Sequence, residues 1–404
     1  MVTGRCYKMK KVYIITKLIF TILVLIVSTA EAQFFKPAVP KIPGIKVTAG
    51  KSVIIPAQTS ALAFQFKDGR IVVGNGKKAA WSYDGGHTWK IGTRGPGTKV
   101  AIDLGNNEIL SIERNSRRRT DGKFTLHQHR SLDNWKTVKD EEAVLNIPQA
   151  SSTVTGSGDR IDGFLFHHGI LRLANGDLIG TMYGNYKGDV ILCDGYPPEL
   201  NQRKYRTIVV FSENNGRTWG NPVLVAYDRM LGRGIPADHK MVGKSIPFSR
   251  VSATTVVPAI TQEGFREADL VQAPNGDIVC VMRSGGRNPG GGVNLFPTPL
   301  YCSMSADSGR HWTPPEQIAD RGVGPSLVAM ENGIIVCTYS RPGNWLIFSD
   351  DNGKTWKGAF QFGNTGSYNY ILEVADDTIQ VYHEIKRGSE KIVVGTFFTV
   401  KKTN

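Results

Sequence analysis

The octapeptide SYDGGHTW, at residues 82–89, decides the fold, because near-copies of it return along the chain. The copies are SENNGRTW (212–219), SADSGRHW (305–312) and SDDNGKTW (349–356), with a shortened version, SLDNW, at 131–135. Serine, aspartate and glycine favour a tight turn whose side chains hydrogen-bond to their own backbone, and the threonine and tryptophan pack such a turn onto neighbouring strands. The repeat therefore predicts one turn structure that is used several times.

A second element, a short turn followed by an apolar strand, recurs six times. The six segments are KDGRIVVG, GNNEILSI, ANGDLIGTM, PNGDIVCVM, ENGIIVCTY and ADDTIQVYH, with turns at Gly69, Asn107, Gly176, Gly276, Gly333 and Asp377. Such turns before β-branched runs are typical of hairpins, and each of the first five is followed by one octapeptide or, after Asn107, by the shortened version. Six units of two hairpins, over residues 45–400, predict an all-β fold, a six-bladed β-propeller. We expect the strand around KSVIIPA (51–57) to complete the last blade.

The N-terminal segment has the layout of a secretory signal peptide. Basic side chains precede an apolar run, LIFTILVLIV at 18–27, and small residues follow in AEA at 30–32. The apolar run is shorter than the roughly 20 residues that a membrane span needs. We therefore expect residues 1–32 to be a signal peptide cleaved before Gln33, no stable membrane span, and export of residues 33–404, as one domain, to the periplasm or the medium.

The charge of the chain indicates an anionic partner. The formal net charge is +14, and residues 1–32 carry five basic and one acidic side chain, so the remainder keeps +10. For an exported protein, this charge favours an acidic oligosaccharide or polysaccharide as partner, although it also serves solubility. No motif of a nucleic-acid module appears, and no ligand spacing indicates a metal or other cofactor. The four cysteines after residue 32 are either buried thiols or disulfide partners.

The octapeptides resemble the Asp boxes, or BNR repeats, of the sialidase (neuraminidase) superfamily, and the resemblance extends over essentially all of residues 33–404. In that family the boxes lie on outer hairpin turns, far from the central pocket. The resemblance thus implies a sialidase-like propeller in which the octapeptides belong to the scaffold. Because fold alone does not assign function, the activity has to be inferred from the residues of the pocket.

Three further segments resemble sialidase segments that carry pocket residues. In GFREADLVQAPNGDIVCVMRSGG, Glu267 begins one strand and Arg283 ends the next. Arg341, in YSRPGNW, matches a later carboxylate-binding arginine, and Tyr368, in TGSYNYILEV, matches the tyrosine nucleophile, with Tyr370 as a rival. The resemblance implies that Glu267 is the base for Tyr368 and that both arginines bind a substrate carboxylate.

The chemistry of this set is coherent. Sialic acid carries a carboxylate on its anomeric carbon, which repels a carboxylate nucleophile, whereas a tyrosine hydroxyl that a neighbouring glutamate deprotonates attacks without that penalty. Arginines bind carboxylates through planar, bidentate contacts.

Two parts of the sialidase pattern are missing, and other residues are candidates to replace them. Arg70 lies in a turn rather than at the start of a strand, and the loop before Ser82 contains no aspartate. His168 in GFLFHHGILRL matches a family histidine and, like its neighbour His167, titrates in a range suited to acid–base catalysis, although a histidine on a strand is also commonly structural. Arg206, at the end of a long insertion, is a candidate substrate contact. The basic run at 113–123 is interpreted as an exposed hairpin tip.

Three functions remain open. The leading one is an exported, exo-acting glycosidase of the sialidase superfamily that cleaves a terminal bond in an acidic glycan containing sialic acid or a uronate. The second is an α-L-rhamnosidase or a polysaccharide lyase that acts on a rhamnose–glucuronate polysaccharide such as ulvan. The third is a lectin-like propeller that binds carbohydrate without catalysis; the absent aspartate favours it, and the presence of Glu267 and Tyr368 argues against it.

Overall fold

The regular elements of the computed structural model are all β-strands, 26 in the part of the chain that it describes. The described ranges are 34–60, 62–74, 79–96, 100–121, 123–154, 160–193, 201–228, 263–285 and 299–403. The all-β class predicted from the sequence is therefore confirmed. From Lys36 onward the chain forms one compact unit, and the predicted signal peptide lies outside the described ranges. Within these ranges no helix has the length and apolar character that a bilayer span requires.

The described strands form six antiparallel arrays of four strands each. Array 1 consists of β2 (Ala63–Gln65), β3 (Ile71–Val73), β4 (Ala79–Ser82) and β5 (Lys90–Gly92). Array 2 consists of β6 (Val100–Gly105), β7 (Glu108–Arg118), β8 (Phe124–Ser131) and β9 (Lys139–Leu145). Array 3 consists of β12 (Phe164–Arg172), β13 (Leu178–Gly184), β14 (Arg206–Ser212) and β15 (Thr218–Ala226). Array 4 consists of β16 (Arg266–Gln272), β17 (Ile278–Arg283), β18 (Leu300–Ser305) and β19 (Glu316–Ala319). Array 5 consists of β20 (Val323–Ala329), β21 (Ile335–Ser340), β22 (Asn344–Ser349) and β23 (Lys357–Gly363). Array 6 consists of β24 (Tyr370–Ala375), β25 (Thr378–Arg387), β26 (Glu390–Lys402) and β1 (Ile45–Ile55). A parallel pairing of β9 with β15 joins arrays 2 and 3 into one eight-stranded sheet, and β10 (Ser152–Val154) pairs with β11 (Arg160–Asp162) as a separate ribbon.

The N-terminal strand completes the last array, as the sequence predicts. β1 pairs antiparallel with β26, from Ile45 opposite Lys402 to Ile55 opposite Val393. Array 6 therefore has the order β24-β25-β26-β1, and it combines the first strand of the described chain with the last three.

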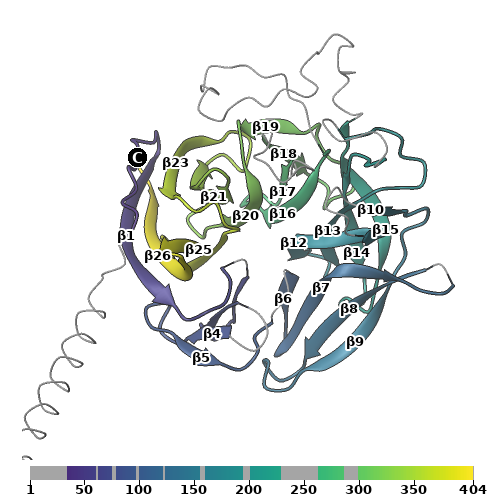
Figure 1. Cartoon of the computed structure of the whole chain (residues 1–404), viewed down its shortest axis with the longest axis horizontal. Helices are drawn as coiled ribbons and strands as arrows, with labels where there is room; N and C mark the ends of the chain where they lie inside the picture. Colours follow the sequence, from purple (N-terminus) through teal and green to yellow (C-terminus); the bar gives the residue numbers. More distant parts are fainter. Residues whose placement is uncertain are drawn as a thin grey trace, which may run out of the picture. The chain divides into compact units, whose positions relative to one another are not determined.

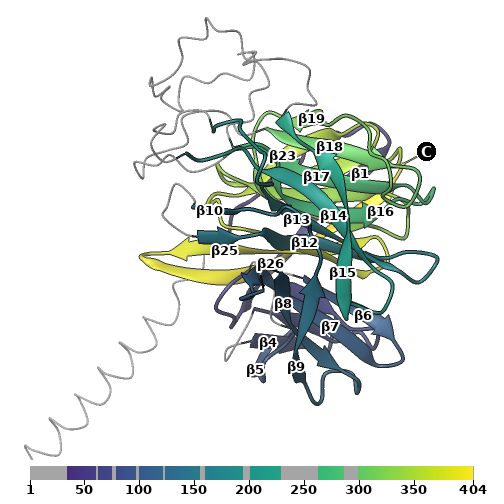
Figure 2. The ribbon, with the colours of Figure 1, turned by 90° about the vertical axis from the view of Figure 1, so that its right-hand side faces the viewer.

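Apolar side chains fill the space between each array and the next. Buried clusters join arrays 1 and 2, 2 and 3, 3 and 4, 4 and 5, and 5 and 6. A further cluster joins array 6 to array 1, where Tyr382 and Val393 pack with Ile71 and Val73. The arrays consequently follow one another around a circle, with β12, β16 and β20 near its centre (Figure 1). Figure 2 views the circle from the side of arrays 2 and 3.

Strands in the middle of an array are covered on both faces. Every residue of β13, β17 and β21 is buried. This explains why the sequence at these strands reads as continuous apolar runs such as IVCVM rather than as an alternation of apolar and polar residues. The four cysteines of the described chain are buried free thiols: Cys193, Cys280, Cys302 and Cys337.

Each full octapeptide forms a turn between the third and fourth strands of an array. In the first copy, Ser82 Oγ accepts a hydrogen bond from the Gly86 backbone N–H (2.9 Å) and donates one to Asp84 Oδ1 (2.8 Å). Asp84 in turn accepts from the backbone N–H and the hydroxyl of Thr88 (2.9 and 2.6 Å). The Trp89 indole N–H donates to the Gly86 carbonyl (2.9 Å). The turn is thus held by its own side chains, as predicted.

The shortened copy at 131–135 keeps the same hydrogen bonds at the same spacing. Ser131 Oγ accepts from the backbone N–H of Trp135 (2.8 Å), and Asp133 accepts from Thr137 (2.8 Å). Trp135 therefore stands where Gly86 stands in the first copy, with a φ of 69°. The tryptophan is not the counterpart of Trp89 that its sequence position suggests.

Replacement of Asp84 tests how much the turn contributes to stability. Burial acts to raise the pKa of Asp84, but the hydrogen bonds from Thr88 outweigh it and lower the pKa to about 2. Asp84→Ala loses these bonds, and we expect it to reduce the free energy of unfolding by about 1 kcal/mol at neutral pH. Asp84→Asn should cost less, because it retains the acceptor and reproduces Asn214 of the 212–219 copy.

The stabilising effect of the negative charge on Asp84 should depend on pH. A carboxyl group whose pKa is lower in the folded state stabilises the fold above its unfolded pKa of about 4, and this stabilisation is lost as the pH falls toward about 2. Urea unfolding of the wild type and of Asp84→Asn at pH 7 and pH 3 measures the difference. We expect the gap between the two proteins to narrow at the lower pH, and a gap that stays constant would contradict the role given to the charge.

Candidate active site

A buried carboxylate, that of Glu267, lies at the start of β16. It falls within a register shift between Arg266 and Asp269, and its φ is 50°, a left-handed conformation that is uncommon for residues other than glycine. A shift of this kind turns a side chain out of the regular alternation of the strand. Glu267 is only 4% exposed, so its charge requires a buried partner.

Arg283, at the end of β17, is that partner. Its Nη1 lies 2.5 Å from Glu267 Oε2, and its Nε donates to the Gly285 carbonyl (2.7 Å). The guanidinium is itself buried at 3% exposure. Burial and the neighbouring Arg266 act to lower the pKa of Arg283, but the Glu267 carboxylate holds that pKa above the ordinary value, so the guanidinium is charged.

Tyr368, which lies just before β24, brings a hydroxyl to the same place. The hydroxyl oxygen is 2.9 and 2.8 Å from the two carboxylate oxygens of Glu267, and it accepts a hydrogen bond from Arg283 Nη1 (2.9 Å). The backbone of Tyr368 is also held in place, because Ser60 Oγ donates to the Tyr368 carbonyl (2.8 Å). Gly324, with a φ of 56°, allows the ring to approach, because a Cβ there would lie 2.3 Å from a ring carbon.

This geometry sets the direction of proton transfer. Burial and the Glu267 carboxylate raise the pKa of the Tyr368 hydroxyl, while Arg283 and Arg341 act in the opposite sense. The hydroxyl is therefore protonated near neutral pH, and its proton points at a carboxylate that can accept it. Glu267 thus has the position of a base for Tyr368, and Arg283 has the charge to stabilise the phenolate that would form.

Two further arginines adjoin this pair. The Arg341 guanidinium carbon is 5.2 Å from the centre of the Tyr368 ring, and its Nε donates to the Gly366 carbonyl (3.2 Å). Arg114, on β7, lies with Nη2 4.0 Å from Glu267 Oε1 and donates from the same atom to the Tyr183 hydroxyl. We refer to Glu267, Tyr368, Arg283, Arg341 and Arg114 as the Glu267 cluster.

Arg114 was not expected at this site. It belongs to the basic run at 113–123, which the sequence suggested to be an exposed hairpin tip. Only the end of that run forms the tip, because β7 extends to Arg118. Arg114 falls in a register shift of β7 between Ile112 and Ser116, and this shift directs it toward the Glu267 cluster. Neither the residue types nor their spacing revealed the shift.

The two histidines predicted as acid–base candidates occupy different surroundings. Both are buried in a register shift of β12, with ring centres 4.3 Å apart. The His167 ring centre lies 6.4 Å from that of Tyr368. His168 instead packs against Tyr370, at 5.5 Å, and its Nδ1 is 3.2 Å from the Pro325 carbonyl oxygen. His167 is thus the histidine on the side of Tyr368.

The remaining two candidates, Tyr370 and Arg206, contact other residues. Tyr370 packs on His168, and burial raises the pKa of its hydroxyl. Arg206 pairs with Asp189 through Nε, 2.8 Å from each carboxylate oxygen, and its guanidinium lies 3.7 Å from the centre of the Tyr227 ring. These contacts tie Arg206 to its own array, and the structure shows no contact between its described side chain and Glu267 or Tyr368.

The first array does not supply a further arginine to the cluster. Arg70 pairs with Asp68 (2.8 Å), and its guanidinium carbon lies 4.2 Å from the centre of the Phe66 ring. It therefore sits in a hairpin turn, as the sequence predicts.

Among the described residues, one group of metal-ligating side chains comes together, Glu113 with His127 and His129.

Comparison with known proteins shows similarity in fold only. No family model and no curated protein matches the chain in sequence. A protein of unknown function from Dyadobacter fermentans superposes with a TM-score of 0.57 at 15% identity, over 89% of this chain and 100% of that one. The GH93 α-L-arabinofuranosidase of Fusarium graminearum superposes with a TM-score of 0.52 at 14% identity, over 86% and 97%. A Hadza microbial sialidase gives a TM-score of 0.47 at 14% identity, and the match spans 87% of this chain and 65% of that one.

Removal of Arg283 tests whether the cluster is an ionic unit. Arg283→Met leaves the Glu267 carboxylate buried without its nearest cation, and we expect a loss of about 3–5 kcal/mol in the free energy of unfolding. Arg321→Met is the matched control, because Arg321 forms a surface pair with Asp320 (3.0 Å) that should contribute at most about 1 kcal/mol. Chemical denaturation compares the two variants, and equal losses would show that the buried pair has no special role.

Proposed function

We propose that the protein is an exported, exo-acting glycoside hydrolase that cleaves a terminal glycosidic bond in an acidic glycan. The observation that carries the proposal is the contact of the Tyr368 hydroxyl with both oxygens of Glu267 and with Arg283. A phenol held between a base and a cation has no evident role in a sheet core, but it is suited to nucleophilic attack on an anomeric carbon that bears a carboxylate. The resemblance of the octapeptides to Asp boxes and the six arrays support a six-bladed, sialidase-like propeller over residues 33–404.

In the proposed reaction Glu267 takes the proton of the Tyr368 hydroxyl while the phenolate oxygen bonds to the anomeric carbon. The bond to the leaving oxygen breaks, and that oxygen takes a proton from an acid, for which His167 is the candidate beside Tyr368. Water then attacks the anomeric carbon and gives a proton to His167 while the bond from that carbon to the Tyr368 oxygen breaks. Glu267 returns its proton to the Tyr368 oxygen, and the free sugar is released.

The arginines of the cluster fit an acidic substrate. Arg114 is the most accessible of the residues that contact Glu267, with a side chain 39% exposed, and Arg341 is partly exposed beside the Tyr368 ring. We therefore assign recognition of a substrate carboxylate to Arg114 and Arg341, together with Arg283 at the base of the site. The proposal includes either sialic acid or a uronate as the acidic sugar.

A second candidate is action on a rhamnose–glucuronate polysaccharide, as an α-L-rhamnosidase or a lyase. It is favoured by the position of His167 near Tyr368, since a histidine and a tyrosine can supply the base and acid of an elimination. This function also does not require the further arginine of the sialidase pattern, and Arg70 lies in its turn rather than in the cluster. A lyase would release an unsaturated uronate that absorbs ultraviolet light, whereas a hydrolase would release saturated sugars.

Substitution of the nucleophile and its base tests the mechanism. Tyr368→Phe and Glu267→Gln should each reduce turnover by about 10²–10⁴-fold, because proton transfer to and from the reacting oxygen is lost. Tyr370→Phe is the matched control and should retain activity, since Tyr370 packs on His168. The assays are release of fluorophore from a fluorogenic sialoside, and product size and ultraviolet absorbance with uronate polysaccharides.

Each outcome separates the alternatives. Sialoside cleavage that is lost in Tyr368→Phe supports the leading proposal. Release of a saturated, terminal acidic sugar from the uronate polymers, lost in the same variant, supports it as well. Release of rhamnose, or of an unsaturated uronate that absorbs ultraviolet light, supports the second candidate. A wild-type protein that binds these glycans but converts none of them would refute catalysis and leave a carbohydrate-binding propeller.

Export is a separate proposal, based on the first 32 residues alone. We expect the protein secreted by a bacterial host to begin at Gln33, which N-terminal sequencing or intact mass determines. Replacement of Leu23 and Leu25 in the apolar run by arginine should retain the protein in the cytoplasm, because the apolar segment is what the export machinery recognises. An exported protein that still begins at Met1 would refute cleavage.

A further inference from the structure

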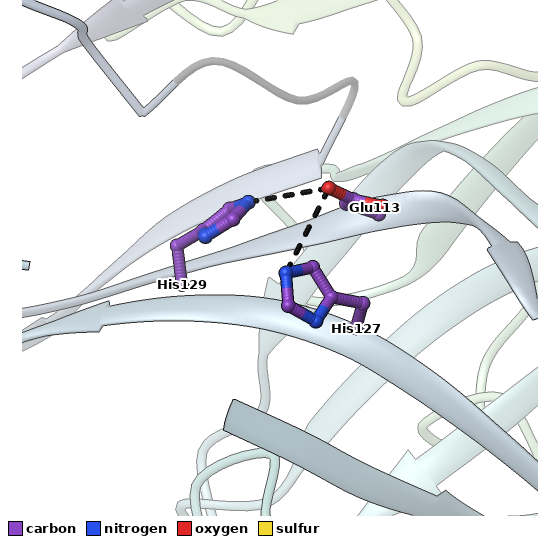
Figure 3. Close-up of side chains that lie close together, drawn as sticks. All are labelled: Glu113, His127 and His129. Carbon is purple, nitrogen blue, oxygen red and sulfur yellow. Dashed lines mark ion pairs between the residues drawn. The ribbon is translucent and has the colours of Figure 1, made fainter. Parts of the chain in front are cut away.

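Glu113, His127 and His129 converge on one face of array 2 (Figure 3). His127 and His129 are two residues apart on β8 and therefore project to the same side of the strand. Glu113 lies in the same register shift of β7 as Arg114. Its Oε1 is 3.5 Å from His129 Nε2 and 3.9 Å from His127 Nε2, and the three atoms all lie within 4.8 Å of one another.

The far nitrogen of each ring faces a carboxylate on β9. His129 Nδ1 lies 2.6 Å from Asp140 Oδ1, and His127 Nδ1 lies 3.2 Å from Glu142 Oε1. The strand register places both carboxylates directly opposite their histidines. Because a carboxylate accepts, each Nδ1 donates its proton to a carboxylate on β9, and each Nε2 faces Glu113. Carboxylate–histidine pairs with this orientation are the usual support of metal-binding histidines.

A contact with Arg94 shows independently that His129 Nε2 is an acceptor. Arg94 Nη2 lies 2.7 Å from this nitrogen, and a guanidinium can only donate. The proton of the neutral ring is therefore on Nδ1, and Nε2 and Glu113 Oε1 are two electron-rich atoms 3.5 Å apart with no proton between them. Such a pair is stabilised by a cation, which the exposed Arg94 side chain provides in this structure.

We propose that Glu113 Oε1, His127 Nε2 and His129 Nε2 bind Zn²⁺. Two imidazoles and one carboxylate are a common zinc ligand set, and three protein ligands leave a fourth tetrahedral position for water. Zinc–ligand bonds of about 2.0–2.1 Å require ligand atoms about 3.4 Å apart. The distance from Glu113 Oε1 to His129 Nε2, 3.5 Å, already has nearly this length, and the distance to His127 Nε2, 3.9 Å, would have to shorten modestly. Arg94 withdraws when the metal binds, because both use the same lone pair.

The site adjoins the Glu267 cluster along the chain. Glu113 and Arg114 are consecutive residues within the register shift of β7. An ion on Glu113 consequently restrains the irregular segment that presents Arg114 to Glu267.

Metal binding is tested on the purified protein after treatment with EDTA, by equilibrium dialysis against Zn²⁺ and by calorimetry. We expect one Zn²⁺ per chain, and with Co²⁺ as a probe the visible absorption of a tetrahedral site. His127→Ala and His129→Ala should each abolish the stoichiometric ion. His311→Ala is the matched control and should keep it, because His311 is 89% exposed in an octapeptide turn and contacts Asp307.

Two variants at the edge of the site do not depend on removal of a ligand. Asp140→Asn should weaken Zn²⁺ affinity about 10–100-fold through loss of the histidine support. It should not affect folding, because the Asp140 side chain is 61% exposed. Arg94→Ala should bind Zn²⁺ more tightly than the wild type. The proposal is overturned if the wild type binds no Zn²⁺, or if both histidine variants bind it as the wild type does.

Discussion

The buried carboxylate of Glu267 is the constraint on which the centre of this fold depends. An ionised carboxylate taken out of water costs several kcal/mol unless it is paired and hydrogen-bonded. Arg283, the Tyr368 hydroxyl and Arg114 supply that pairing from three other parts of the chain. Arrays 2, 4 and 6 must therefore be brought together at one point, which a ring of sheets with a closed apolar core achieves.

Irregular strand pairing gives the site its side chains. Register shifts occur in β7, β12, β16 and β20, and they contain Arg114, His167 with His168, Glu267, and Gly324 respectively. In a regular strand, alternate residues face the neighbouring arrays and are used for packing. An extra residue breaks the alternation and turns a polar side chain toward the centre. The same device at Gly324 makes room for the Tyr368 ring.

The sequence predicted the local features of the fold better than the site. The octapeptide turns and the strand hairpins depend on contacts within a few residues, so the hydrogen bonds of Ser82 and Asp84 could be assigned correctly from their spacing. Thr88 was expected to pack on the strands, but it is exposed and donates to Asp84 instead. The meeting of Glu267, Arg283 and Tyr368 followed from resemblance, not from periodicity. Arg114 was missed because a register shift has no marker in residue type, and the shortened octapeptide concealed a Trp135 that takes the place of a glycine.

The geometry also indicates different roles for Arg283 and Arg114. Arg283 is 3% exposed, and its Nε and Nη1 contact Gly285, Glu267 and Tyr368, so its main effect is to fix the Glu267 carboxylate and the Tyr368 hydroxyl relative to each other. A substrate carboxylate that drew Arg283 toward itself would weaken its hold on Glu267 and make that carboxylate a stronger base. In the proposed function Arg114, with its side chain 39% exposed, would contact the substrate first. Substrate binding and activation of Tyr368 would then be coupled through one shared set of charges.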